Sequence, residues 1–237
     1  MKSLSIIIPC YNEVQNLPLL IQRCKEVINQ NSNIDIEIVI VDNGSNDDTS
    51  LVLDKLTSSL SYITRVNIEV NQGYGHGILS GLDSSSGEIL SWTHADMQTD
   101  LGDVLKGLEF FNSESNSEIL FVKGNRHGRS LVSAFFTVAM SFFETCLLGK
   151  FMWDINAQPT MFHRNFYSTW DLPPKDFSLD LYAYYFAKKS KLKVKRFPVL
   201  FPERINGISN SNFNLISRYH FIIRTLIYSL SLKKRMR

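Results

Sequence analysis

The sequence predicts an α/β protein with a doubly wound, mostly parallel sheet and helices on both faces. Short apolar runs, typical of buried strands, alternate with amphipathic helical segments across the first hundred residues. A polar or glycine-rich cluster follows each of the first four runs, as loops at the carboxyl ends of parallel strands do. We therefore expect these four clusters to meet along one rim of the sheet.

The strands and helices of the first half follow from local pattern. Leu4–Ile8 is a β-branched run that Pro9 is expected to end. A helical pattern begins at Asn16, with Pro18 tolerated in its first turn, and continues to Ile28. By the same patterns we expect strands at Ile36–Val41, Arg65–Val70 and Ile89–Thr93, and helices at Thr49–Leu60 and Ile78–Leu82.

The second half contains a long apolar segment among ordinary elements. Leu131–Phe143 holds thirteen uncharged residues, fewer than the roughly 20 that a membrane span needs. It is expected to be either a buried helix or a helix in a membrane interface. The other elements expected here are helices at Leu101–Phe111 and Phe177–Lys188 and strands at Ile119–Lys123 and Leu192–Leu200.

The C-terminal segment Leu215–Leu232 mixes apolar and charged residues and ends in KKRMR. Charges interrupt it too often for a membrane span. An amphipathic helix with a basic end can lie on an anionic membrane surface, and the alternative is a helix packed on the core. We expect one domain over residues 1–212 and a basic amphipathic helix over 213–237, in contact with a membrane surface.

Composition excludes several other classes. With 237 residues, 20% charged and 44% hydrophobic, the chain is typical of a single globular domain. Its formal charge of +2 is too small to indicate a nucleic-acid partner. Its three cysteines have no metal-ligand or redox spacing, and the N-terminal apolar run is too short for a signal peptide. We expect a cytoplasmic protein without disulfides.

The most informative stretch is GEILSWTHADMQTD, residues 87–100. Behind its apolar run, His94, Asp96, Gln98 and Asp100 occupy alternate positions, which share one face in an extended chain. Oxygen ligands suit Mg²⁺ and Mn²⁺, so this row could hold a divalent cation and, through it, a diphosphate. The alternative is an ordinary solvated junction between strand and loop.

Acidic clusters after two of the strands point to one ligand. Asp42 lies in the first cluster and Asp96 in the second. A nucleoside diphosphate sugar would explain both, because one carboxylate can bind the base or ribose while a metal at the other offsets the diphosphate charge.

Four ordered motifs carry a resemblance to a known family. SIIIPCYNE, IVIVDNGSNDDT, NQGYGHGILSGL and GEILSWTHADMQTD resemble the family 2 glycosyltransferases of the GT-A fold, in particular dolichyl-phosphate mannose synthases and bacterial polyprenyl-phosphate glycosyltransferases. The resemblance is strong over Ser3–Arg129 and moderate over Trp153–Ser209. It implies a nucleotide pocket that contains Pro9, Tyr11, Glu13 and Asp42. Without the resemblance, Glu13 is explained as a helix cap and Asp42 as part of a turn.

The resemblance also implies a metal site with one departure from the family. The family binds Mg²⁺ or Mn²⁺ and diphosphate through Asp-x-Asp followed by glutamine. Here His94 replaces the first aspartate and leaves Asp96 and Gln98 as the matching ligands. His94 could bind manganese, contact a phosphate when protonated, or mark a weakened dependence on metal.

The remaining implied residues lie in the second half. KGNRHGRS resembles a segment that contacts acceptor or diphosphate, which implies roles for Arg126 and Arg129. DINAQPTMFHR resembles a block in which a helix starts beneath the donor sugar, with Asp154 and Gln158 as candidate contacts. FPERINGIS resembles a phosphate-closing loop, with Arg204 as the clamp. The expected catalytic residues are Asp96, Arg126 and Asp154.

The glycine-rich motif admits a simpler explanation than phosphate binding. Gly73, Gly75 and Gly77 resemble a phosphate cradle but lack the lysine and the serine or threonine that follow in a P-loop. We expect a tight turn beside the nucleotide, with His76 pointing to solvent or a neighbouring loop.

Together these residues predict an inverting glycosyltransferase that uses a UDP- or GDP-linked sugar and acts at the cytoplasmic face of a membrane. A polyprenyl phosphate acceptor is favoured, because its oxygen is already anionic and needs no general base. A saccharide hydroxyl acceptor, as in surface polysaccharide synthesis, would need a carboxylate base, for which Asp154, Asp176 and Asp180 are the candidates. An inactive nucleotide-binding homologue is the third alternative.

Overall fold

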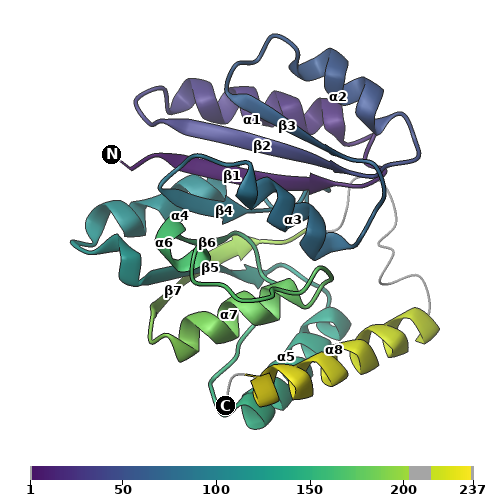
Figure 1. The fold of residues 1–237 in the computed structure, drawn as a ribbon, viewed down its shortest axis with the longest axis vertical. Helices are drawn as coiled ribbons and strands as arrows, with labels where there is room; N and C mark the ends of the chain where they lie inside the picture. The colour runs from purple at the N-terminus through teal and green to yellow at the C-terminus, as the bar shows by residue number, and fades with distance from the viewer. Residues whose placement is uncertain (1, 203–214, 236–237) are drawn as a thin grey trace.

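The computed structural model describes residues 2–202 and 215–235, with residues 215–222 described by their backbone alone. Its centre is a seven-stranded sheet of order β3-β2-β1-β4-β6-β5-β7 (Figure 1). All neighbouring strands run parallel except β6, which is antiparallel to β4 and β5. The predicted fold class is therefore confirmed.

The element bounds agree with the predicted ones to within a few residues at most ends. The strands are β1 Leu4–Cys10, β2 Ile36–Asn43, β3 Ile63–Ile68, β4 Ile89–Trp92, β5 Leu120–His127, β6 Thr160–His163 and β7 Lys193–Leu200. The helices are α1 Leu17–Gln30, α2 Thr49–Thr57, α3 Tyr74–Asp83, α4 Gly102–Ser113, η1 Ser117–Ile119, α5 Leu131–Leu148, α6 Arg164–Tyr167, α7 Leu179–Lys189 and α8 Leu215–Arg235.

Two of these differences affect the site. Pro9 does not end β1, which continues to Cys10 in register with Asp42 of β2. The helix implied for Asp154–Arg164 is absent from that stretch, where a turn leads into β6. β6 has four residues, all buried, and so shows no alternation that would reveal a strand.

Helices cover both faces of the sheet. On one face, α1, α2 and α4 pack against side chains of β1, β2 and β5 in a single apolar core. On the other, α3, α6 and α7 pack against a second core that contains Trp92 and Phe162. Because β1, β2 and β4 are adjacent and parallel, the loops at their carboxyl ends lie at one edge of the sheet and form the rim.

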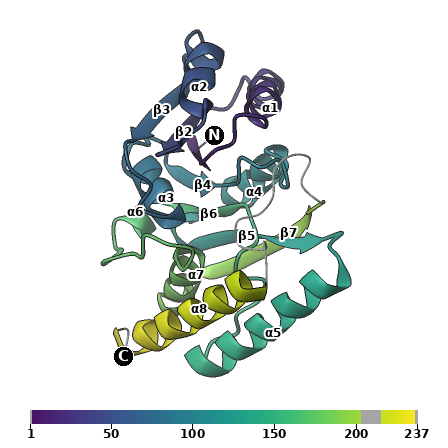
Figure 2. The same cartoon turned by 90° about the vertical axis from the view of Figure 1, so that its right-hand side faces the viewer.

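α5 and α8 lie side by side outside these layers (Figure 2). α5 has 18 residues and a mean hydropathy of 1.8, enough by length and composition alone to cross a membrane, and only 17% of it is buried. Leu131 is 88% exposed and Phe142 71%. The expectation of a buried helix is therefore wrong for this segment, and the alternative of an interfacial helix stays a prediction.

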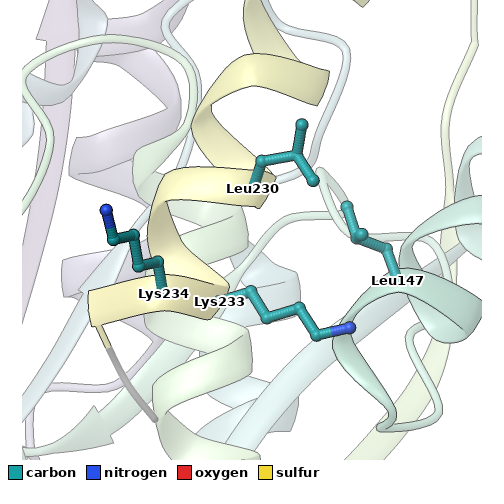
Figure 3. A pocket seen from close by; sticks show the side chains of 4 residues that line it. All are labelled: Leu147, Leu230, Lys233 and Lys234. Atoms are coloured by element: carbon teal, nitrogen blue, oxygen red, sulfur yellow. The ribbon is translucent and has the colours of Figure 1, made fainter.

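α8 packs on α5 through its inner side. Ser229 is buried and donates a hydrogen bond of 2.7 Å to the buried carboxylate of Glu144 on α5. Ile227 and Leu230 face outward. A groove of about 340 Å³ between the two helices is lined by Leu147, Leu230, Lys233 and Lys234 (Figure 3). The predicted domain boundary at 212/213 lies outside the described residues.

Candidate functional site

The loops after β1 and β2 are joined by hydrogen bonds into one wall of the rim. The amide of Asn12 donates to Ser45 Oγ at 3.0 Å, and Asn12 Oδ1 accepts from the amide of Asn46 at 3.0 Å. The amide of Glu13 donates to Thr49 Oγ1 at 3.0 Å. Asn12 has a φ of 56°, which turns the chain so that both bonds form.

The predicted nucleotide-binding residues lie on this wall. Asp42 is 5% exposed, and its Oδ1 accepts from the amide of Ser45 at 3.1 Å. Pro9 and Tyr11 are half-buried at the end of β1. Glu13 Oε2 accepts from Asn16 Nδ2 at 2.6 Å just before α1, so this side chain also orders the start of the helix. Their contact with nucleotide stays a prediction.

The loop after β4 is bent rather than extended. Met97 has a φ of 59°, and Asp96 Oδ1 accepts from the amide of Gln98 at 3.1 Å within the turn. Asp100 points to α1, where Arg23 donates to both its carboxylate oxygens at 2.9 and 3.1 Å. The predicted row of alternate side chains on one face is therefore wrong for Asp100, because the chain does not stay in a strand.

Gln98 connects this loop to the end of β7. Its Nε2 donates to the carbonyl of Pro202 at 2.9 Å. The segment that follows Pro202 contains Arg204, which lies outside the described residues. The predicted phosphate clamp therefore stays a prediction.

The donor set fits a cation shared with a substrate better than a protein-only metal cage. Within the described part of the chain, no three His, Cys, Asp or Glu side chains gather as metal ligands. Mg²⁺ is commonly held by one or two carboxylates together with substrate phosphates. Asp96, buried to 4% exposure at the rim, and Gln98 can supply a carboxylate and an amide oxygen.

His94 lies against aromatic rings. Its imidazole stacks on Tyr74 with ring centroids 5.9 Å apart and an interplanar angle of 30°. Tyr74 also stacks on Phe177, at 4.9 Å and 10°. The Tyr74 ring is thus in contact with both others at the edge of the rim.

The glycine-rich motif accommodates a neighbouring backbone rather than a phosphate. A Cβ at Gly73 would lie 2.5 Å from the carbonyl oxygen of Lys175, and one at Gly75 would lie 2.6 Å from that of Asp176. The amide of His76 donates to the carbonyl of Lys175 at 2.8 Å. The motif is therefore a docking site for the loop before α7, and the expected tight turn is wrong, because Gly75 and Gly77 lie in the first turn of α3. The direction of the His76 side chain stays a prediction.

A buried polar network lies beneath the rim. Gln158 is fully buried, and its Nε2 donates to Asp180 Oδ1 at 2.9 Å and contacts the Tyr74 hydroxyl at 3.3 Å. Trp92 Nε1 donates to the same Asp180 oxygen at 3.3 Å. The ammonium of Lys123, also fully buried, lies 3.6 Å from it and donates to Thr160 Oγ1. Gln158 is thus part of a structural network and borders the site through Tyr74.

Sequence analysis missed Lys123 and Trp92 in this network. The available signal was a lysine inside the apolar run LFVKG, since a buried lysine needs a partner. Burial lowers the pKa of Lys123 to about 8, against the opposing attraction of Asp180.

This lowered pKa predicts a pH-dependent stability. Between about pH 8 and pH 10.5 the unfolded chain binds the Lys123 proton and the folded chain does not, so stability should rise with pH by about 1.4 kcal/mol per unit. Urea unfolding of wild type and Lys123→Met at pH 7.5 and 9.5 measures it. The difference in free energy of unfolding between the two proteins should change by more than about 1 kcal/mol from pH 7.5 to pH 9.5. An equal response in both would contradict the assignment.

A cluster of arginines surrounds Asp154 at the end of β5. Asp154 is 1% exposed, and its Oδ1 accepts from Arg126 Nε at 2.9 Å and Nη2 at 2.5 Å. Its Oδ2 accepts from the Arg126 amide at 2.9 Å, and Arg129 Nη2 lies 3.9 Å from Oδ1. Burial alone would raise the pKa of Asp154, but Arg126 and Arg129 bring it below its ordinary value.

A third arginine, which sequence analysis missed, completes the cluster. Arg196 of β7 donates to the carbonyls of Trp153, Gly124 and Asp154. These bonds hold the turn in which Asp154 adopts a φ of 42°. The cluster therefore carries three guanidinium groups around one carboxylate, and Arg126 and Arg129 remain partly accessible beside α5, at 13% and 10% side-chain exposure.

Two curated proteins with similar sequences each match less than half of this chain. An undecaprenyl-phosphate 4-deoxy-4-formamido-L-arabinose transferase from Pseudomonas savastanoi is 37% identical over 98 residues, 41% of this chain and 29% of that protein. The human dolichyl-phosphate beta-glucosyltransferase is 32% identical over 111 residues, 44% of this chain and 34% of that protein. The matched stretch thus spans about a third of these relatives.

Solved structures share the whole fold. Glucosyl-3-phosphoglycerate synthase from Mycobacterium tuberculosis, in complex with Mn²⁺, UDP and glucosyl-3-phosphoglycerate, superposes with a TM-score of 0.70 at 15% identity. The superposition covers 97% of this chain and 80% of that one. The same enzyme with Mg²⁺ and UDP gives 0.69 at 16% identity. Since the model of glycosyl transferase family 2 matches residues 5–173, well over half of the chain, this protein belongs to that family.

Proposed function

We propose that this protein transfers one sugar from a nucleoside diphosphate sugar to the phosphate of a polyprenyl lipid, with inversion at the anomeric carbon. Family membership supports glycosyl transfer, and the curated relatives are named for undecaprenyl-phosphate and dolichyl-phosphate acceptors. The choice of acceptor rests on a cluster of partly accessible arginines at the N-terminal end of α5, an exposed apolar helix.

The arginine cluster suits a phosphate. Arg126 and Arg129 lie near the single carboxylate of Asp154, and Arg196 donates to the backbone carbonyl of the same residue, so this half-buried part of the molecule has an excess of positive charge. An excess of that kind is offset when an anion binds, and guanidinium groups bind phosphate through paired hydrogen bonds. A phosphate oxygen that is already anionic can attack the sugar without losing a proton.

The adjoining α5 suits the lipid part of the same acceptor. Leu131, at its start, follows Arg129 by two residues and is 88% exposed. Phe135 and Phe142 continue the exposed apolar side along the helix. A prenyl chain, or the membrane that holds it, would cover this surface. Lys233 and Lys234 at the end of the neighbouring α8 would then lie near anionic headgroups.

The carboxylates proposed as bases for a hydroxyl acceptor are engaged elsewhere. Asp154 is held by Arg126, and Asp180 by Gln158, Trp92 and Lys123. Asp176 Oδ1 accepts from the amide of Ser178. These contacts favour the phosphate acceptor over a saccharide hydroxyl.

The donor is assigned to the rim. Pro9, Tyr11, Glu13 and Asp42 would bind the nucleoside, as the resemblance of their motifs implies. Asp96, with Gln98, would hold Mg²⁺ or Mn²⁺, and this cation would neutralise charge on the departing nucleoside diphosphate. Solved relatives of the same fold bind Mn²⁺ or Mg²⁺ together with UDP, which supports this assignment.

The experiment is a transfer assay with three matched acceptors. Radiolabelled UDP- and GDP-linked sugars are incubated with a long-chain polyprenyl phosphate, the corresponding polyprenol and a saccharide, and the products are extracted into organic solvent. We expect solvent-extractable label with the phosphate alone. Label only in water-soluble saccharide would overturn the proposed acceptor. No transfer from any donor, with nucleotide binding intact, would favour the inactive homologue.

A further inference from the structure

We propose that His94, Tyr74 and Phe177 form an aromatic platform for the pyranose ring of the donor sugar, so that His94 is a sugar-binding residue and not a metal ligand. This inference rests on the proposed function, since it concerns how the same donor is held. It assigns a role to the residue at which this chain departs from the family's metal-binding motif.

The rings of His94, Tyr74 and Phe177 are stacked. Tyr74 stacks on both partners, at 4.9 Å from Phe177 and 5.9 Å from His94, with interplanar angles of 10° and 30°. Near-parallel contacts of this kind are favourable aromatic arrangements. Stacking fixes the plane of the His94 ring and gathers the three rings into one aromatic cluster.

Neighbouring residues hold these rings in place. The Tyr74 hydroxyl contacts Gln158 Nε2 at 3.3 Å, and Gln158 is itself hydrogen-bonded to Asp180. Gly73 and Gly75 allow the loop before α7 to approach the start of α3 closely. This approach brings Phe177 onto Tyr74. The glycine-rich motif therefore explains the stack although it binds no phosphate.

The three rings lie near the loop that contains Asp96. His94 precedes Asp96 by two residues in the same bent loop, so the rings lie beside the carboxylate proposed for the diphosphate. Phe177 is 42% exposed and His94 is half-buried. A pyranose linked to a diphosphate at Asp96 would reach this surface, and the C–H face of a pyranose is its apolar side. An aromatic ring is a suitable partner for it.

Calorimetry on the protein of residues 1–237 distinguishes a sugar-binding role of His94 from a role as metal ligand. Binding of UDP, UDP-glucose, GDP and GDP-mannose is measured with and without Mn²⁺ for wild type, His94→Phe, His94→Ala and Phe177→Ala. His94→Phe keeps an aromatic ring but has no nitrogen to bind metal. Circular dichroism melting checks that each variant is folded, and Phe177→Ala tests the platform from a different loop.

If the rings bind the sugar, the substitutions should change only the part of the binding free energy that the sugar adds to that of the nucleoside diphosphate. His94→Ala and Phe177→Ala should weaken the nucleotide sugar about five- to tenfold, while the nucleoside diphosphate and its dependence on Mn²⁺ stay unchanged. His94→Phe should bind like wild type. Loss of Mn²⁺-linked nucleoside diphosphate binding in both His94 variants would overturn the inference, as would unchanged binding throughout. If wild type binds none of the nucleotides, the proposed function fails as well.

Discussion

Replacement of Asp96 by asparagine is expected to reduce sugar transfer by about 10²–10³-fold, the usual loss when one group that stabilises transition-state charge is removed. The substitution keeps the size of the side chain and an oxygen that can accept from the Gln98 amide, as Asp96 Oδ1 does at 3.1 Å. It removes the negative charge that Asp96 is proposed to contribute to a bound cation. The loss should therefore appear in the rate and in the metal dependence, with little change in stability.

The measurement combines initial rates with calorimetry of nucleoside diphosphate binding at several Mn²⁺ concentrations. Asp100→Asn is the matched control, because Asp100 lies in the same loop but is paired with Arg23. We expect the control to transfer sugar within about twofold of wild type, as surface substitutions away from a site usually change little. Wild-type rates and unchanged Mn²⁺ linkage in Asp96→Asn would exclude this carboxylate from the metal site.

The elements that sequence analysis predicted well are those with a local signal. β1, β2 and β4 are buried apolar runs, and each ends in a polar cluster, so their positions along the chain and the existence of the rim followed from pattern alone. β6 escaped because four buried residues have no periodicity, and because an antiparallel strand inserted between β4 and β5 is determined by long-range pairing.

The site shows the same division between local and long-range information. Asp42 and Asp96 were proposed as site residues from two motifs, each of which is a single short stretch of the sequence. The partners of Asp154 and Gln158 were not, because they come from distant segments: Arg126 is 28 residues from Asp154, and Asp180 is 22 from Gln158. The stack of Phe177 on Tyr74 depends on the loop before α7, which packs against the glycine-rich motif but is not specified by it.

Substitution of Asp154 by alanine is expected to destabilise the protein by about 3–5 kcal/mol, the cost of removing one partner of a buried ion pair. Asp154 is 1% exposed, and its loss leaves the Arg126 guanidinium, which bonds to it at 2.9 and 2.5 Å, without a counter-charge. Urea unfolding at pH 7 measures this effect. Asp176→Ala is the control: its carboxylate is about one-third exposed and lies 3.5 Å from Arg224, so its loss should cost under about 1 kcal/mol.

The pH dependence of the stability of Asp154→Asn distinguishes an ion-pair role from a catalytic base. The pKa of Asp154 is lower in the folded protein than in the unfolded chain, where it is near 3.9. Its contribution to stability is therefore complete above about pH 5 and is lost as the pH falls through the folded pKa. The difference in free energy of unfolding between wild type and Asp154→Asn should become smaller in acid. Because burial opposes this shift, a difference that instead grew below pH 5 would show that Arg126 does not hold the ionised form.

A double substitution then tests what the pair does for transfer. Replacing both residues, as in Arg126→Met with Asp154→Asn, removes both charges and keeps at position 154 a side chain that tolerates its φ of 42° and can accept from the amide of residue 126, so it should recover most of the stability lost in Asp154→Ala. Transfer to polyprenyl phosphate should stay low, because the guanidinium proposed for the acceptor phosphate is gone. Recovery of both stability and transfer would mean that the arginine serves the fold alone, and the acceptor phosphate would then have to bind at Arg129 or elsewhere.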